Sequence, residues 1–266
     1  MSILKIALGA MLALYVLLVL ALYFFQENFI FLGEPLPADY QYSFSSPFEE
    51  IDYTMTDGAI INALHFRSDQ SKGIIYYHHG NAGNLARWGG IVQYFVQFGY
   101  DVLVYDYRGY GKSTGHRSEA LMHQDAQFIY DQLKTSWNED QILVYGRSLG
   151  SGLACQLASN NTPGKLILET PFYSLKSIAQ WRFPFLPTSL LVSYNMLNWK
   201  NLQQTTSPIY IFHGTDDGVV PYWSGEKLYE SVPKGQAAFT TIEGAQHNNL
   251  IDFEAYRQEI EQILTQ

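Results

Sequence analysis

The sequence is poor in cysteine and in charge. Its single cysteine, Cys155, excludes an intramolecular disulfide, a CxxC redox pair and a thiolate-rich zinc site. Only 15% of the 266 residues are charged, against roughly 25% in ordinary soluble domains. Acidic residues outnumber basic ones by 25 to 16, for a formal net charge of −9, and no block of Lys and Arg occurs. Because phosphate binding needs clustered basic residues, nucleic acid is excluded as a partner.

Apolar residues are abundant instead. They make up 47% of the chain, and aromatic residues make up 15%, which is ample material for one large core. Single α/β domains commonly reach this length.

Ile6–Phe25 is an apolar run of 20 residues without one charge. As a helix it is about 30 Å long, the thickness of a bilayer core. A cleaved signal peptide and a buried soluble helix are the alternatives. A signal peptide is usually followed by small residues, whereas Tyr23, Phe24 and Phe25 are bulky and suit a membrane interface. We expect an uncleaved anchor in residues 1–27, a juxtamembrane linker in 28–48 and a globular domain in 49–266.

The basic residues near this run predict its orientation. Lys5 and the terminal amine precede it, and the next basic residue is Arg67. The positive-inside rule counts Lys and Arg. It places the amino terminus in the cytoplasm and the globular domain on the non-cytoplasmic side.

Strands and helices alternate after residue 49, which predicts an α/β fold with a mostly parallel, eight-stranded sheet and helices on both faces. Sites in such sheets form beyond the carboxyl ends of the strands. Strands are predicted at Ile51–Thr56, Ala59–Phe66, Gly73–Tyr77, Asp101–Tyr105, Gln141–Tyr145, Lys165–Glu169, Pro208–Phe212 and Ala237–Ile242. Helices are predicted near Asn84–Phe98, Ser118–Thr135, Leu149–Asn160, Tyr222–Ser231 and Asn249–Leu264.

A GxSxG pentapeptide, Gly146–Gly150, follows the fifth predicted strand and precedes a helix. In this context the glycines allow the sharp turn that exposes a nucleophilic serine, here Ser148. The alternative is an ordinary glycine-rich turn with a solvent-facing serine.

A serine nucleophile needs a histidine base and a carboxylate that orients the base. With this motif the chain order is serine, acid, histidine. Only His213 and His247 follow Ser148. His247 lies in a loop after the last predicted strand and is the predicted base, while His213, at the end of its own strand, is predicted to be structural.

The acid must lie between Ser148 and His247. Asp217 is favoured, because it sits in a loop after a strand and Gly218–Pro221 would anchor that loop. Asp216 and Glu169 remain alternatives. The other acidic residues considered fall within a helix or too close to the histidine: Glu226, Glu230 and Glu243.

Two backbone amides are needed to bind the oxyanion that forms during acyl transfer. Leu149 directly follows the nucleophile at a helix amino terminus, whose dipole assists. The second amide is predicted at Asn81, in the small-residue loop after Gly73–Tyr77.

Two other motifs fail on inspection. Gly111-Lys112-Ser113 resembles the end of a P-loop, but Asp106 stands where that motif needs glycine. His78 and His79 lack the i, i+4 spacing of a helical zinc site. The sequence therefore predicts neither a cofactor nor a metal.

Together these residues resemble the α/β-hydrolase superfamily over Glu49 to Leu264. The motifs that carry the resemblance are His79–Asn84, Asp106–Ser113, Gly146–Gly150, His213–Pro221 and Gln246-His247. Within the superfamily the chain looks like the membrane-anchored branch related to fungal Bem-type proteins and animal protein depalmitoylases. The resemblance implies an α/β-hydrolase fold with a triad of Ser148, Asp217 and His247 and with oxyanion donors at Asn81 and Leu149.

The function expected is a membrane-tethered serine hydrolase that cleaves carboxylic esters or thioesters through an acyl-serine. A catalytically silent scaffold and a peptidase of the same fold are the alternatives. The long connection at 171–206 is where this superfamily inserts a cap, and it is rich in aromatic and aliphatic residues, with only positive charges. These side chains either pack the cap onto the domain or line a pocket for a lipid-like acyl ester.

Overall fold

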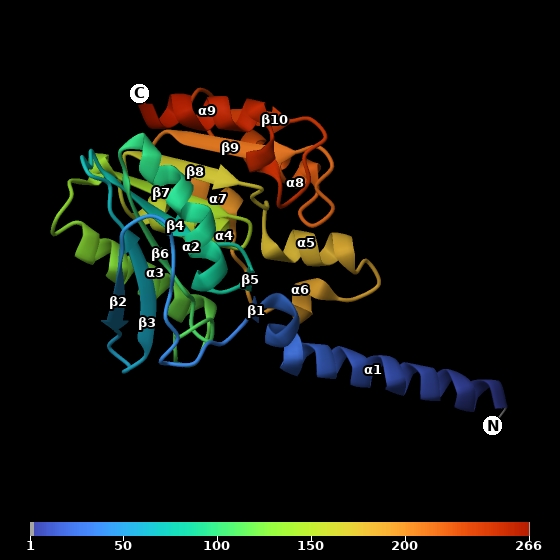
Figure 1. Ribbon diagram of the computed structural model, residues 1–266. Helices are drawn as coiled ribbons and strands as arrows, with labels where there is room; N and C mark the ends of the chain where they lie inside the picture. Colours follow the sequence, from blue (N-terminus) through green and yellow to red (C-terminus); the bar gives the residue numbers. More distant parts are fainter. Residues whose placement is uncertain (1–2, 266) are drawn as a thin grey trace.

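An eight-stranded sheet forms the centre of the molecule in the computed structural model, which describes residues 3–265 (Figure 1). The spatial order is β10-β9-β8-β7-β4-β6-β3-β2. Strand β3 runs antiparallel to both β2 and β6, and every other pair is parallel. The predicted fold class, a mostly parallel sheet of eight strands, is confirmed.

The observed strands differ from the predicted ones by at most three residues at either end. The sheet consists of β2 Phe48–Thr54, β3 Ile60–Phe66, β4 Ile74–His78, β6 Asp101–Tyr105, β7 Ile142–Arg147, β8 Lys165–Glu169, β9 Ile209–Gly214 and β10 Ala237–Ile242.

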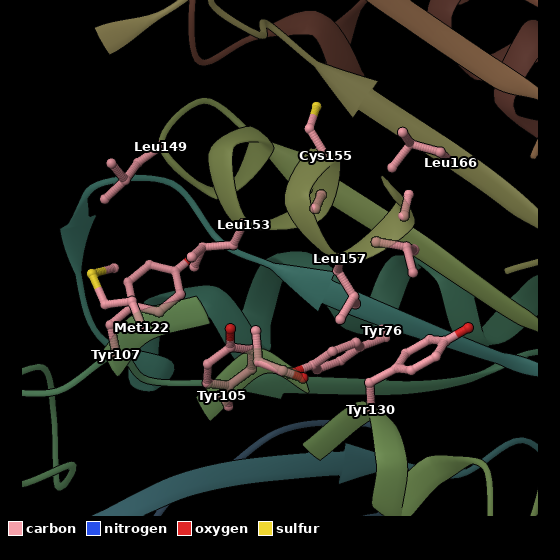
Figure 2. Packing of buried hydrophobic residues seen from close by; sticks show 14 of the residues in the cluster. Tyr76, Tyr105, Tyr107, Met122, Tyr130, Leu149, Leu153, Cys155, Leu157 and Leu166 are labelled. Atoms are coloured by element: carbon pink, nitrogen blue, oxygen red, sulfur yellow. The ribbon is translucent and has the colours of Figure 1, made fainter. Parts of the chain in front are cut away.

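Helices cover both faces of the sheet because successive strand residues point to opposite sides. In β4, Ile74 and Tyr76 belong to the core cluster that includes residues of α3 Glu119–Leu133, α4 Gly150–Asn160 and α8 Tyr222–Glu230. Ile75 and Tyr77 belong to the cluster on the other face, which includes residues of α2 Leu85–Val92 and α9 Glu254–Thr265. Figure 2 shows the first layer, in which Leu153 and Leu157 of α4 lie over the rings of Tyr76 and Tyr105.

Two predicted helices are shorter than expected. The stretch 84–98 divides into α2 and a 3-10 segment, η1 Gln93–Phe98, and the stretch 249–264 divides into η3 Leu250–Asp252 and α9. A further short 3-10 segment, η2 Glu139–Gln141, leads into β7.

Helix α1, Ile3–Ile30, projects away from the domain (Figure 1). It extends past both ends of the predicted run Ile6–Phe25. By length and composition it can cross a membrane, and none of its residues is buried in the protein. The terminal amine used in the orientation argument lies outside the described residues.

The segment expected to be a linker packs on the domain. Phe31 and Tyr42 are buried, and β1, Leu32–Gly33, pairs in parallel with β5, Ala82–Gly83. This second, two-stranded sheet was not predicted, because two residues carry no hydrophobic period.

Three short helices occupy the cap region between β8 and β9: α5 Leu175–Arg182, α6 Thr188–Leu191 and α7 Asn198–Leu202. Helix α7 packs on α4, while α6 lies beside the end of α1 and α5 packs on α6 (Figure 1). The cap therefore lies between the domain and the apolar helix.

Candidate active site

Ser148 sits at the turn between β7 and α4 with a backbone φ of +51°, a value that few non-glycine residues adopt. The turn is tight enough that a Cβ on Gly150 would collide with the carbonyl oxygen of His78, so the position requires glycine. This strained turn projects the Ser148 side chain beyond the carboxyl end of the sheet. The side chain is mostly buried, with 8% of the residue exposed.

His247 and Asp217 complete a chain of hydrogen bonds with Ser148. The Nε2 atom of His247 lies 2.9 Å from the Ser148 Oγ, and its Nδ1 atom lies 2.7 Å from an Asp217 carboxylate oxygen. The three residues come from loops after β7, β9 and β10. The structure thus brings together the nucleophile, acid and base named from the sequence.

Asp217 is held as a carboxylate by its surroundings. Burial alone would raise its pKa, but hydrogen bonds from His213 and His247 and the backbone amide of Val219 outweigh burial and hold the pKa well below the usual range. Its second oxygen accepts from the Val219 and Val220 amides at 2.8 and 2.9 Å. Ionised in this way, it can fix the orientation of the His247 ring.

The other candidate residues have different surroundings. Asp216 is exposed. Glu169 is buried, lies 3.2 Å from the Arg147 guanidinium and accepts a hydrogen bond from the Tyr145 hydroxyl. His213 is fully buried and its Nε2 lies 2.9 Å from the Val220 carbonyl oxygen, so it supports the loop that carries Asp217.

The predicted oxyanion donors flank Ser148. Leu149 follows it at the start of α4, and within residues 3–265 neither the Leu149 nor the Asn81 amide donates to another protein group. The Asn81 side chain is fixed instead, because its oxygen accepts from the Leu32 amide at 3.1 Å and the Tyr110 hydroxyl at 2.9 Å. Both amides are therefore available to a substrate oxygen.

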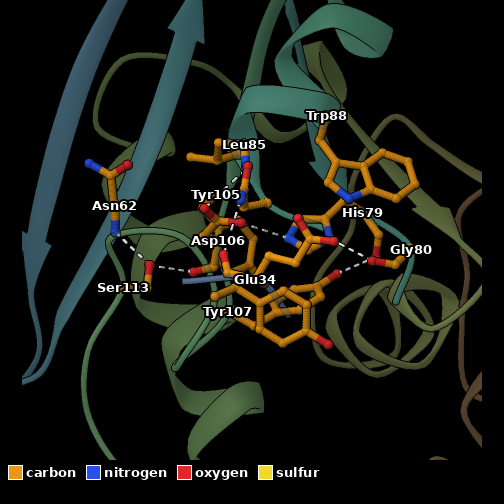
Figure 3. Close-up of polar contacts among 12 residues, drawn as sticks. Glu34, Asn62, His79, Gly80, Leu85, Trp88, Tyr105, Asp106, Tyr107 and Ser113 are labelled. Atoms are coloured by element: carbon orange, nitrogen blue, oxygen red, sulfur yellow. Dashed lines mark hydrogen bonds and ion pairs between the residues drawn. The ribbon is translucent and has the colours of Figure 1, made fainter. Parts of the chain in front are cut away.

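A buried polar cluster surrounds His79 and Gly80, the residues that precede Asn81 in the chain (Figure 3). The Tyr107 hydroxyl donates to the His79 carbonyl at 2.6 Å, and the His79 Nε2 lies 3.4 Å from the Asp106 carboxylate. Burial raises the pKa of Asp106, while contact with His79 opposes that rise. The opposite Asp106 oxygen accepts from the Leu85 amide, which ties the loop to the start of α2.

The sequence and the fold are similar to those of known proteins. The family model described as serine aminopeptidase, S33, matches residues 69–198. The chain is 29% identical over 264 residues to the membrane protein YNL320W of Saccharomyces cerevisiae, covering 95% of this chain and 93% of that one. An esterase from Pyrococcus furiosus, Pf2001, superposes with a TM-score of 0.69 at 18% identity, over 87% of this chain and 98% of the esterase. The chain has the α/β-hydrolase fold and is similar to hydrolases of that superfamily.

A second group of relatives matches only part of this α/β-hydrolase. The lysophosphatidylserine lipase ABHD12 of Macaca fascicularis is 34% identical over 179 residues, which is 60% of this chain and 45% of the lipase. The chain thus spans less than half of the length of that relative.

A cavity of about 390 Å³ opens above Ser148 and His247 in this α/β-hydrolase. Its walls are mainly apolar, and the cap contributes Ile178, Phe183 and Val192. Three arginines also line it, namely Arg87, Arg147 and Arg182, and its described lining contains no carboxylate.

Sequence reasoning missed the contribution of the segment after α1. Phe29 and Ile30 at the end of α1 line the cavity, as does Leu32 of β1. Leu32 also supplies the amide that holds the Asn81 side chain. The sequence feature that pointed to this segment was its position directly after the apolar run.

Proposed function

We propose that this α/β-hydrolase is a membrane-tethered serine hydrolase that cleaves carboxylic esters or thioesters through an acyl-serine intermediate. The observation that carries the proposal is the hydrogen-bonded chain Ser148–His247–Asp217 at the floor of the apolar cavity.

Each residue has a distinct role in the proposed reaction. His247 accepts the proton of the Ser148 hydroxyl as the oxygen attacks the acyl carbon, and Asp217 stabilises the imidazolium that forms. The amides of Asn81 and Leu149 bind the oxyanion, and the amino-terminal dipole of α4 adds to that stabilisation. His247 then protonates the leaving group, and a water activated by the same ring releases the acid.

The tether in this proposal is α1. Its length and apolar composition support a membrane span, and YNL320W is a membrane protein. Lys5 is the only basic residue before Arg67, which supports a cytoplasmic amino terminus and a domain on the opposite side.

A lipid-like ester is the substrate class that fits the cavity best. The walls are apolar, and ABHD12 is by name a lipase of lysophosphatidylserine. An aminopeptidase must bind the ammonium group of its substrate, for which a carboxylate is the natural partner. The cavity's described lining offers three arginines and no carboxylate, which disfavours the peptidase alternative.

Active-site labelling tests the proposal against a silent scaffold. A fluorophosphonate reacts only with an activated serine, so the wild-type chain is expected to be labelled and Ser148→Ala is not. Ester turnover in Ser148→Ala is expected to fall on the order of 10⁶-fold, with an unchanged thermal midpoint.

Ser159→Ala is the matched control, because Ser159 is a partly buried serine at the far end of α4. It is expected to keep both labelling and turnover. If Ser148→Ala retains more than a tenth of the turnover, the assigned nucleophile is wrong; a wild-type chain that resists labelling supports the scaffold.

A further inference from the structure

The tip of the cap, residues 183–190, comprises the turn after α5 and the first three residues of α6, and it exposes large apolar side chains. Phe185 is 89% exposed and Leu190 is 81% exposed. The tip contains no charged residue, and residues 171–207 around it contain no Asp or Glu although the chain has a net charge of −9. An exposed apolar surface of this kind marks a binding surface.

A polar clamp fixes the cap against the domain-side end of α1. The Gln26 side chain donates to the Ser193 hydroxyl at 3.0 Å and accepts from the Ser193 amide at 2.8 Å. The Tyr194 hydroxyl donates to the Glu27 carboxylate at 2.7 Å. The direction of α1 relative to the cap is therefore set by specific contacts.

The cap tip also contacts α1 at a second point, within the apolar stretch that precedes the clamp in the chain. The Tyr15 hydroxyl donates to the Phe185 carbonyl at 3.1 Å. Tyr15 precedes Gln26 by 11 residues, which is about 16 Å along a helix. A bilayer core is about 30 Å thick, so a helix that crosses it from a polar boundary at Gln26 carries Tyr15 to mid-depth.

We propose that the cap tip inserts into the hydrocarbon layer of the bilayer that α1 crosses. The proposal rests on the membrane tether of the proposed function. Lipid is the partner because the tip is continuous with α1, which is itself apolar and unburied, and because it touches α1 at a depth that water does not reach.

The backbone of the cap tip suits this environment. Polar backbone groups at membrane depth must be satisfied by the protein itself. The carbonyls of residues 183 to 187 all accept hydrogen bonds, whose donors are the Leu186 amide, the Gln180 side chain, the Tyr15 hydroxyl, the Thr188 amide and the Leu190 amide. Pro184 and Pro187 have no amide hydrogen, and the Phe183 and Leu186 amides donate to the carbonyls of Ala179 and Phe183. Among residues 183 to 187, the Phe185 amide alone donates to no protein group within the described residues 3–265.

Insertion would also open the cavity to lipid. The cavity is lined by Phe29 and Ile30 from α1 and by Ile178, Phe183 and Val192 from the cap. The seam between α1 and the cap therefore leads from the membrane side to Ser148. An acyl chain could reach the serine along this seam without crossing water.

Depth-dependent quenching in vesicles tests the insertion. The full chain, with Cys155→Ala to remove its only thiol, receives a single cysteine labelled with the environment-sensitive fluorophore NBD. The three positions are Phe185 in the tip, Leu20 on α1 and Lys234 in an exposed turn far from both. The proteins are reconstituted in phosphatidylcholine vesicles with lipids brominated either near the headgroup or near the chain end.

We expect the labels at 185 and 20 to shift to the blue and to be quenched by brominated chains, and the label at 234 to respond to neither. If the label at position 20 is quenched but the label at 185 is not quenched, like the label at 234, the tip stays in water. The inference is then wrong, although α1 is in the membrane. If 20 and 185 both fail to respond, the tether fails and the inference falls with it. Fluorophosphonate labelling of the same samples reports separately on the hydrolase.

A functional comparison uses Phe185→Asp and its conservative counterpart Phe185→Leu. Phe185 does not line the cavity, so both variants are expected to hydrolyse short soluble esters like the wild type. On a long-chain ester held in vesicles, Phe185→Asp is expected to lose roughly 10-fold in rate, because a charge opposes insertion, whereas Phe185→Leu retains it. Equal rates for the two variants on vesicles would overturn the inference.

Discussion

At the scale of single residues, the neighbouring aspartates of the β9–α8 loop differ sharply. Asp217 is buried, receives two backbone amides and lies 2.7 Å from His247, whereas Asp216 is exposed. Asp217→Asn is expected to lower kcat by roughly 10⁴-fold, because the amide favours the wrong tautomer of His247. Asp216→Asn is the matched control and should stay within about two-fold of the wild type, since an exposed side chain outside the relay contributes little. Ester kinetics on the two variants show which aspartate is the acid. If Asp216→Asn loses activity and Asp217→Asn keeps it, the acid is Asp216.

Asp217 also makes the stability of the folded protein depend on pH. The pKa of Asp217 is held below its unfolded value of about 3.9 by the hydrogen bonds that outweigh burial. A depressed carboxyl pKa stabilises the fold above the unfolded pKa, and this stabilisation is lost as the pH falls toward the folded pKa. In urea titrations, the difference in free energy of unfolding between wild type and Asp217→Asn should be full above about pH 4 and shrink below it. A difference that stays constant down to pH 2 would show that the carboxylate is not stabilised by the fold.

Sequence reasoning worked best where chain order and loop chemistry constrain the answer. His247 followed from the elimination of the other histidines, and Asp217 was favoured through Val219 and Val220, whose amides do bind it. The side-chain partners of Asn81 could not be foreseen. Leu32 and Tyr110 lie 49 and 29 residues from Asn81 along the chain. No local feature of the sequence predicts either contact.

At the scale of elements, β1 joins the apolar helix to the loop that carries Asn81, the predicted oxyanion donor, which is called the oxyanion loop below. It pairs with β5, and the Leu32 amide holds the Asn81 side chain. Leu32→Pro removes that donor and is expected to lower kcat about 10-fold, which is less than the 10²–10³-fold cost of losing an oxyanion donor outright. Leu32→Ala keeps the amide and should keep kcat. The readout is kcat at saturating short ester, with the thermal midpoint of each variant measured alongside.

Equal kcat values for these two variants would mean that β1 does not position the oxyanion loop. A truncated chain that starts at Pro35 gives a second check. It lacks both α1 and β1, so we expect it to be soluble but impaired in turnover. A fully active chain from Pro35 would likewise rule out a role for β1.

The cap predicts a preference for longer acyl groups. Each buried methylene contributes about 0.8 kcal/mol, so four more carbons raise kcat/KM by up to about 200-fold. We expect kcat/KM to rise from two-carbon to at least six-carbon p-nitrophenyl esters below their micellar concentrations. Ala179→Trp fills the cavity wall and should flatten this rise, whereas Lys176→Trp on the same helix lies outside the lining and should preserve it. A steady fall beyond two carbons in the wild type would indicate a shallow pocket.

Elements with a long hydrophobic pattern were predictable, and short ones were not. All eight strands of the main sheet were located from the sequence, because buried parallel strands appear as apolar runs between turns. The pairing of β1 with β5 was missed, since its partners are two residues long and far apart. Helix α2 ends early at Val92, where Gly89 and Gly90 weaken the helical preference of the preceding turn.

At the scale of the whole molecule, helix α1 and the candidate active site form one structural unit. The end of α1 lines the cavity, the clamp at Gln26 and Glu27 fixes the cap, and β1 holds the side chain of Asn81, the predicted oxyanion donor. A free linker between anchor and domain would allow the site to face any direction. The packed segment 31–48 instead fixes the position of the cavity relative to α1.

The placement of the chain can be tested in cells. If α1 is an uncleaved anchor, the full-length protein stays in the membrane fraction through high-salt and alkaline washes, because removing a spanning helix exposes its whole apolar surface to water. With Lys5 as the only basic flank before Arg67, the domain is expected on the non-cytoplasmic side. Protease added to sealed, cytoplasmic-side-out vesicles should leave a tag at the carboxyl end intact until detergent opens them. As a control, a variant with lysines in place of Gln26 and Asn28 reverses the balance of basic residues and should weaken that protection. A tag digested without detergent would reverse the orientation, and a mature protein that begins after Phe25 would show that the helix is a cleaved signal.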